Sequence, residues 1–174
     1  MKPFLHFIVI LLTGLLLTGC VGSRLIQYPV NSNEASLNSP AAEFDPQITD
    51  RYIVFASDRR GRQDIYLYDQ QEKALVDLPG LNRLDAIASA PTISNNGQYI
   101  TFLATQGKQS NIYLYNRETR QLRNLTQNLQ AEVRNPTMSG EAGMVAFESS
   151  VNGQWDILVY NRYGQPLNLP LDPE

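Results

Sequence analysis

The fold is decided by residues 91–115, PTISNNGQYITFLATQGKQSNIYLY, because their pattern occurs three times in the chain. Phe102 has counterparts 47 residues earlier and 45 residues later, and Ile112 and Tyr115 recur at the same intervals. In every copy the phenylalanine precedes the isoleucine by 10 residues, and the isoleucine precedes the tyrosine by 3. Such repetition is considered before single elements are assigned. The repeated positions are Phe55, Phe102 and Phe147, then Ile65, Ile112 and Ile157, and then Tyr68, Tyr115 and Tyr160.

Each repeat unit contains two apolar runs that predict β-strands. The runs are too short for helices, are rich in β-branched and aromatic residues, and are bounded by Gly, Asn, Asp or Ser. They are apolar at consecutive positions, whereas a half-buried strand alternates, so both faces of each small sheet should be covered. Because no long helical segment lies between the runs, the cover must be another sheet. The runs are residues 52–56, 99–103 and 144–147 in one set, and 65–68, 112–115 and 157–160 in the other.

A repeat of this length with about four short strands is typical of a β-propeller blade. We therefore predict an all-β domain over residues 44–174, built as a partial β-propeller of three four-stranded antiparallel blades. Pro91 and Pro136 each stand 11 residues before the phenylalanine of their unit, but that place in the first unit holds Phe44. An abbreviated first strand is the prediction for the first unit.

Each unit also contains further residues of a known repeat motif. They are Pro91, Ser94, Gly97, Ile100 and Leu125 in the second unit, Ser57, Asp58, Arg59, Gly61 and Asp64 in the first, and Pro136, Ser139, Gly153 and Asp156 in the third. Together with the positions above, they resemble the TolB-type, WD40-like propeller repeat over roughly residues 44–170, with three units where TolB has six. The resemblance implies a cell-envelope protein whose partner is another envelope protein, such as a peptidoglycan-associated lipoprotein or a component of a transport assembly.

The first twenty residues have the features of a bacterial secretory signal. Lys2 supplies the only charge before an almost wholly apolar run at residues 4–17, which is short for a helix that crosses ~30 Å of hydrocarbon. Residues 17–20, LTGC, then resemble the lipobox of bacterial lipoproteins, in which the chain is cut before the cysteine and the cysteine is acylated. We predict a signal peptide at residues 1–19 and a membrane anchor on Cys20. The alternatives are an ordinary signal peptide with a chance cysteine, or an uncleaved anchor.

A flexible tether is predicted between the anchor and the repeats, at residues 20–43. This segment is rich in Asn, Ser, Pro, Ala and Glu and sustains no strand or helix period. Residues 25–30 are the piece best able to pack onto the domain instead. Val21 stands where Asp commonly marks inner-membrane retention, so the expected location is the periplasmic face of the outer membrane.

Composition and charge argue against several classes of function. The 174 residues carry 14 Lys and Arg against 17 Asp and Glu, a net charge of −3, which disfavours nucleic-acid binding. Cys20 is the single cysteine, and the single histidine, His6, lies in the predicted signal peptide. A mature chain of this kind has no internal disulfide, no zinc cluster and no histidine-dependent triad. We predict no enzyme activity, no catalytic residue, no metal and no cofactor.

Two carboxylate pairs could be considered for acid–base or metal chemistry, Asp58 with Asp64 and Asp69 with Glu72. Structural roles are the preferred interpretation for both pairs. Asp58 and Asp64 occupy repeat positions whose side chains typically bond loop backbone, and the second pair lies in the hairpin after a strand.

Three arginines, Arg59, Arg60 and Arg62, cluster in one loop of the first unit. They are candidate contacts for an acidic partner or anionic headgroups, and a solvated loop is the alternative interpretation. Five strand tyrosines are predicted to pack between blades rather than to form a sugar-binding platform. These are Tyr66, Tyr68, Tyr113, Tyr115 and Tyr160.

Three blades do not close a ring, so two apolar faces are left over, and each approaches the largest patch that a soluble monomer normally shows. One solution is a homodimer in which blade three of each chain packs on blade one of the other, giving a six-bladed ring. Another is an open fan whose ends are covered by the tether or by a partner protein.

The predicted function is that of a lipid-anchored envelope protein whose non-catalytic propeller is a platform for protein contacts. The alternative is a carbohydrate-binding or hydrolase accessory module, since fold does not fix function. That alternative predicts carboxylates such as Asp58, Asp64 and Asp156 converging on the central channel, or a ligand pocket with exposed aromatics. A truncated gene product without a task of its own is a third possibility.

Overall fold

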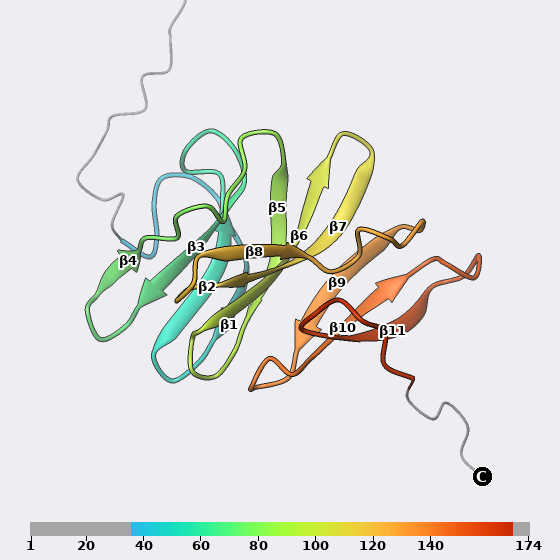
Figure 1. Cartoon of the computed structure of the whole chain (residues 1–174). Helices are drawn as coiled ribbons and strands as arrows, with labels where there is room; N and C mark the ends of the chain where they lie inside the picture. Colours follow the sequence, from blue (N-terminus) through green and yellow to red (C-terminus); the bar gives the residue numbers. More distant parts are fainter. Residues whose placement is uncertain (1–35, 169–174) are drawn as a thin grey trace, which may run out of the picture. The chain divides into compact units, whose positions relative to one another are not determined.

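The computed structural model describes residues 36–168, which all belong to one compact unit. This range holds eleven β-strands and no helix (Figure 1). No stretch within it is a helix long and apolar enough to cross a membrane. The predicted signal peptide, Cys20 and most of the predicted tether lie outside the described residues.

The strands form three antiparallel sheets, each made from consecutive strands, which we name blades 1, 2 and 3 (Figure 1). Blade 1 contains β1 (Glu43–Ile48), β2 (Tyr52–Ser57), β3 (Asp64–Asp69) and β4 (Ala74–Val76). Blade 2 contains β5 (Ile87–Ile93), β6 (Tyr99–Gln106), β7 (Gln109–Asn116) and β8 (Gln121–Asn124). Blade 3 contains β9 (Val133–Met138), β10 (Met144–Ser149) and β11 (Asp156–Asn161). The predicted all-β architecture with a four-strand meander in each of the first two units is confirmed.

Blade 3 differs from the prediction of four strands, since its described part has three strands and a single bridge between Tyr160 and Pro166. The chain after β11 does turn back, because the amide of Leu167 donates to the carbonyl of Val159 at 2.7 Å. Pro166 has no N–H to donate, so it cannot extend the ladder as other residues do. The place of a fourth strand is therefore occupied by a short extension rather than by a regular strand.

The prediction of an abbreviated first strand in the first unit is wrong. β1 has six residues, as many as β9, and its proline is Pro46, which stands 45 residues before Pro91. The β1–β2 turn is two residues shorter than its counterpart, with three residues between Ile48 and Tyr52 against five between Ile93 and Tyr99. A spacing counted back from the phenylalanine therefore missed this proline.

Each of these prolines belongs to an irregularity in the first strand of its blade. The preceding residues, Asp45, Ala90 and Asn135, have φ values of 50°, 46° and 50°. The strand register shifts beside each of them, which is the mark of a β-bulge. The bulge is thus part of the repeat.

The core lies between blades, as the continuous apolar runs predicted. Val54 and Ile65 of blade 1 pack with Phe102 of blade 2 in one cluster of buried side chains. Ile112 of blade 2 packs with Phe147 of blade 3 in a second cluster. The phenylalanine of each unit after the first therefore points toward the preceding blade.

Candidate functional site

Blade 3 has one sheet face toward blade 2 and one face without a following blade in the described chain. Val145 and Phe147 of β10 lie in the core shared with blade 2, so the residues between them point the other way. Their cross-strand partners on β11 share that second face. We define the open face of blade 3 as Met144, Ala146, Glu148, Ile157 and Val159.

The exposed fractions of side chains at equivalent repeat positions show that this face is uncovered. Ile65 and Ile112 are 1% and 0% exposed because the next blade covers them, whereas Ile157 is 62% exposed. Met144 on the same face is 46% exposed. The repeat has placed side chains suited to an interblade core on a surface.

The charges beside the open face neutralise one another. Arg134 of β9 forms an ion pair with Glu148, and the amide of Asn135 donates to the same carboxylate at 2.9 Å. These two contacts, that of Asn135 first, hold the pKa of Glu148 below its ordinary value. The guanidinium of Arg134 also lies 3.8 Å from the ring centroid of Trp155, which is 42% exposed. The open face is therefore apolar, with one internally compensated ion pair and an aromatic ring at its edge.

The opposite end of the blade series, the first face of blade 1, is partly covered by an arginine, while Phe44 and Ile48 at this end are 42% and 66% exposed. The first two units each stack their phenylalanine on a tyrosine, with ring centroids 5.8 Å apart for Phe55 and Tyr66 and 5.9 Å apart for Phe102 and Tyr113. Blade 1 covers the second of these pairs. No blade in the described part of the chain precedes the first pair, and the guanidinium of Arg59 lies over both of its rings, 5.1 Å from Phe55 and 4.8 Å from Tyr66.

Arg59 is fixed there by the chain segment that leads into the domain. Its guanidinium donates to the carbonyls of Ser36 and Leu37 at 2.9 and 2.8 Å and to Glu43 at 2.9 Å. Ser39 donates its hydroxyl to the same carboxylate at 2.6 Å. The side chain of Arg59 is only 3% exposed as a result. We name this group of contacts the Arg59 clasp.

The three clustered arginines thus have different environments. Arg59 points inward, Arg62 donates to both oxygens of Asp64 at 2.9 and 2.8 Å, and Arg60 is exposed, its guanidinium lying 5.9 Å from the Tyr66 ring. Contact with a partner through this loop stays a prediction, and Arg60 is the member that is free to make it. Sequence reasoning missed the role of Arg59, although Gln106 and Val151, its uncharged counterparts in the other units, were a signal of it.

The candidate carboxylates do not converge. Asp58 accepts the amide of Ala42 at 2.9 Å, Asp64 pairs with Arg62, and Asp156 accepts the side-chain amides of Asn152 and Gln154. Asp69 is engaged by Arg51 and by two turn amides, one of them that of Glu72. Within residues 36–168, no group of three or more His, Cys, Asp or Glu side chains could hold a metal ion.

The tyrosines divide between the blades and the outer faces. Tyr113, Tyr115 and Tyr160 pack against the interblade cores, as predicted, and the hydroxyl of Tyr115 donates to the carbonyl of Pro79 at 2.8 Å. Tyr66 and Tyr68 alternate with Ile65 and Leu67, which lie in the core, and so belong to the first face of blade 1. That face has no preceding blade, and the prediction of interblade packing is wrong for these two.

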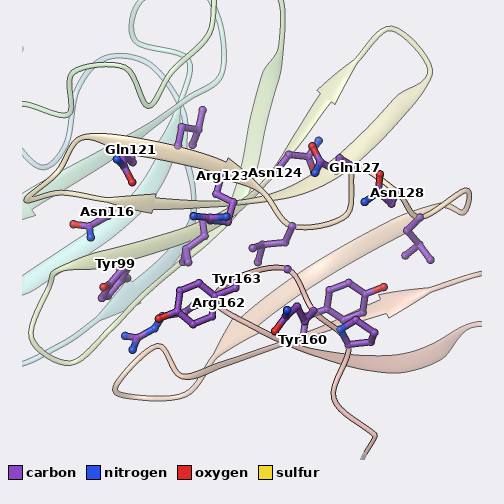
Figure 2. Close-up of a pocket in the computed structure, with 17 residues that line it drawn as sticks. Tyr99, Asn116, Gln121, Arg123, Asn124, Gln127, Asn128, Tyr160, Arg162 and Tyr163 are labelled. Carbon is purple, nitrogen blue, oxygen red and sulfur yellow. The ribbon is translucent and has the colours of Figure 1, made fainter.

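A pocket of about 950 Å³ lies between the outer part of blade 2 and the end of blade 3 (Figure 2). Asn116, Gln121 and Asn124 line it from blade 2, and Tyr160 and Tyr163 line it from blade 3. Tyr163 is 59% exposed, and burial raises the pKa of the Tyr160 hydroxyl. The lining includes two arginines and no Asp or Glu, so it offers donors, amide acceptors and rings but no carboxylate pair for hydrolysis.

Solved structures share this architecture. TolB from Acinetobacter baumannii matches with a TM-score of 0.58 at 23% identity, over 72% of this chain and 31% of its own. The chain has a TolB-like β-propeller fold. The protein assigned as TolB from Agrobacterium tumefaciens matches with a TM-score of 0.57 at 17% identity, over 75% of this chain and 48% of its own. The expected TolB-like repeat is confirmed at the level of the fold.

The TolB-like fold also occurs in proteases. The β-propeller domain of the Trilobed protease from Pyrococcus furiosus, whose topology is described as open velcro, matches with a TM-score of 0.54 at 15% identity, over 74% of this chain and 41% of its own. The present chain spans less than half the length of each of these three proteins. No protein-family profile and no curated protein matches the sequence.

Proposed function

We propose that this protein is a non-catalytic interaction platform of the bacterial cell envelope and that the open face of blade 3 is its contact surface. The exposure of Ile157, at a position buried in both other blades, is the observation that carries this proposal. Exposed apolar side chains that continue a repeat core mark a place for a partner rather than a surface built for water.

Anchoring through an acylated Cys20 is part of the proposal and rests on the lipobox-like sequence at residues 17–20. Its test is metabolic labelling with an alkyne fatty acid, followed by membrane fractionation. The wild-type chain should take up the label and sediment with outer membranes, and Cys20→Ser should lose both properties. Label on the Cys20→Ser chain, or an unlabelled wild type, would refute the anchor without touching the propeller.

The platform itself is tested by a photo-crosslinking amino acid at position 157 in intact cells. A discrete protein adduct should form at this position and not at Leu84, which is 90% exposed and lies outside the open face. Adding Met144→Glu to the same chain should abolish the adduct, because a charge would then have to be buried against the partner. Equal adducts from positions 157 and 84 would contradict the proposal.

Carbohydrate binding is a second candidate function, favoured by the pocket of Figure 2. Amide side chains beside an exposed tyrosine suit the hydroxyls and apolar ring faces of a sugar. Soluble peptidoglycan fragments should bind in a calorimetric titration, and Tyr163→Ala should weaken that binding at least about tenfold. Val151→Ala, at an exposed position outside the pocket, is the control. An unchanged titration for Tyr163→Ala would remove this candidate.

A further inference from the structure

The two ends of the blade series are chemically different. At blade 1, the Arg59 clasp covers the aromatic pair that a preceding blade would otherwise cover. At blade 3, the described residues place no equivalent group over the open face, and Ile157 and Met144 are exposed. Phe44 and Ile48 at the blade 1 end are also exposed, at 42% and 66%, but a blade that docked there would meet the Arg59 clasp, whereas the described residues place no such group over the open face of blade 3.

Docking of another blade on the blade 1 end would disturb the contacts of the Arg59 clasp. The incoming sheet would either bury the Arg59 guanidinium more deeply or displace it from Phe55 and Tyr66. Displacement would break the ion pair with Glu43 and the hydrogen bonds from the guanidinium to the carbonyls of Ser36 and Leu37. A six-bladed ring made from two chains requires that contact twice, so the clasp disfavours the ring.

The open face of blade 3 is suited to a copy of itself. An isologous contact needs a surface that complements its own twofold image. A face with net charge would be repelled by its copy, but here Arg134 and Glu148 cancel within one chain. Across a twofold axis, the arginine of each copy can also face the carboxylate of the other.

From these observations we propose that the open faces of two copies of this chain pack on each other about a twofold axis, giving a dimer in which both blade 1 ends point outward. The proposal rests on the function proposed above and names a second copy as the partner of that surface. Sheet faces pack about 10 Å apart with interdigitating side chains, which would bury Ile157, Val159 and Met144 of both chains. One blade face is a small interface, so a reversible dimer is expected.

The first test uses single cysteines in the full chain in its native membrane, with a short bis-maleimide linker. Cys20 is the only natural cysteine, so the unmodified chain is the background control. Ile157→Cys and Met144→Cys should each give a crosslinked dimer of this chain. Ile48→Cys, at the blade 1 end and 66% exposed, and Leu84→Cys should not. Far-ultraviolet circular dichroism of the purified variants checks that each remains folded.

Each remaining outcome is decisive. A dimer that forms only when Ile48→Cys and Ile157→Cys are combined in one chain would indicate the ring and overturn the isologous dimer. An adduct of position 157 with a different protein would overturn the dimer and leave the interaction platform standing. The absence of a crosslinked dimer at positions 157 and 144, together with the absence of any photo-crosslinked adduct at position 157, would overturn both.

A charge exchange provides a second, independent test. Glu148→Arg alone gives the face a net positive charge and should abolish the Ile157→Cys dimer, and Arg134→Glu alone should do the same with the opposite sign. Coexpression of the two variants should restore a mixed dimer, because each face then meets its opposite. Failure of the mixture to restore any dimer, with both variants folded, would contradict self-association through this face.

Discussion

At the scale of single residues, Arg59 shows how one side chain can end a repeat series. Its counterparts in the other two units are Gln106 and Val151. In those units the phenylalanine packs against the preceding blade, so no arginine is needed to cover it. The planar guanidinium can lie on two rings and still donate to three oxygens in its own plane, which an ammonium group cannot do. Arg59 therefore supplies both an apolar cover and a satisfied charge.

Arg59→Ala should destabilise the domain by about 2–3 kcal/mol, because it uncovers Phe55 and Tyr66 and removes the ion-pair partner of Glu43. Arg60→Ala, a neighbouring exposed arginine, should change stability by less than about 0.5 kcal/mol and is the matched control. Urea unfolding followed by tryptophan fluorescence measures both. A similar midpoint for the two variants would show that the clasp carries no stability.

The ion pair between Arg51 and Asp69 should make the free energy of unfolding depend on pH in the acidic range. Arg51 donates to Asp69 at 2.9 and 2.6 Å, and this contact, aided by two turn amides, holds the pKa of Asp69 below its ordinary value. A lowered pKa in the folded state means that this stabilisation is present above the unfolded pKa of about 4 and is lost as the pH falls through the folded value. The stability difference between wild type and Asp69→Asn should therefore narrow below about pH 4 in chemical unfolding. A difference that stays constant with pH would contradict this assignment.

At the scale of secondary-structure elements, equivalent strands of the three blades have the same sequence pattern but different surroundings. β7 lies between two packed faces, whereas β11 has the blade 2 side covered and the other side open. The loss of stability caused by the same substitution should therefore depend on whether the strand is covered on both faces, and not on its sequence pattern.

Ile112→Ala should cost about 2–4 kcal/mol, because it leaves a cavity in the core between blades 2 and 3. Ile157→Ala should cost less than about 1 kcal/mol in dilute protein, since most of that side chain is already in water. Equilibrium unfolding at low protein concentration makes the comparison. Equal costs would mean that the open face is covered by another part of the chain.

The bulge in each first strand gives a prediction for β5. Ala90 has a φ of 46°, a conformation that costs a residue with a Cβ about 1–2 kcal/mol, and Asp45 and Asn135 at the other bulges are side-chain types that tolerate it better. Ala90→Gly should therefore stabilise the domain by about 0.5–1 kcal/mol after the added freedom of the unfolded chain is subtracted. The melting temperature reports the change, and a decrease would show that the Ala90 methyl group is needed for packing.

At the scale of the whole molecule, the blades form a short linear series in which each blade contacts only its neighbours. The stability of such a series depends on nearest-neighbour interfaces, so an uncovered end opens more easily than the middle. The Arg59 clasp reduces this weakness at blade 1, whereas no group among residues 36–168 does the same at the open face of blade 3.

Hydrogen exchange should therefore be faster in β11 than in β7 when the protein is dilute. The protection of β11 should rise with protein concentration if the open faces pair, whereas that of β7 should stay constant. Mass spectrometry of peptides covering residues 156–161 and 109–116 measures both. Equal protection of the two strands at low concentration would show that blade 3 needs no neighbour.

The sequence alone determined the repeat register, the positions of the second and third strands of each unit and the all-β class. These follow from local side-chain patterns that recur in all three units. It could not identify Pro46 as the equivalent of Pro91 and Pro136. The β1–β2 turn is shorter, so the spacing between proline and phenylalanine differs in the first unit although the bulge is kept. The number of blades predicted two uncovered faces, but the sequence did not reveal that Arg59 lies over the first of them or that a pocket forms beside Tyr163. These depend on which blade has a neighbour, and that is settled only when distant segments pack together.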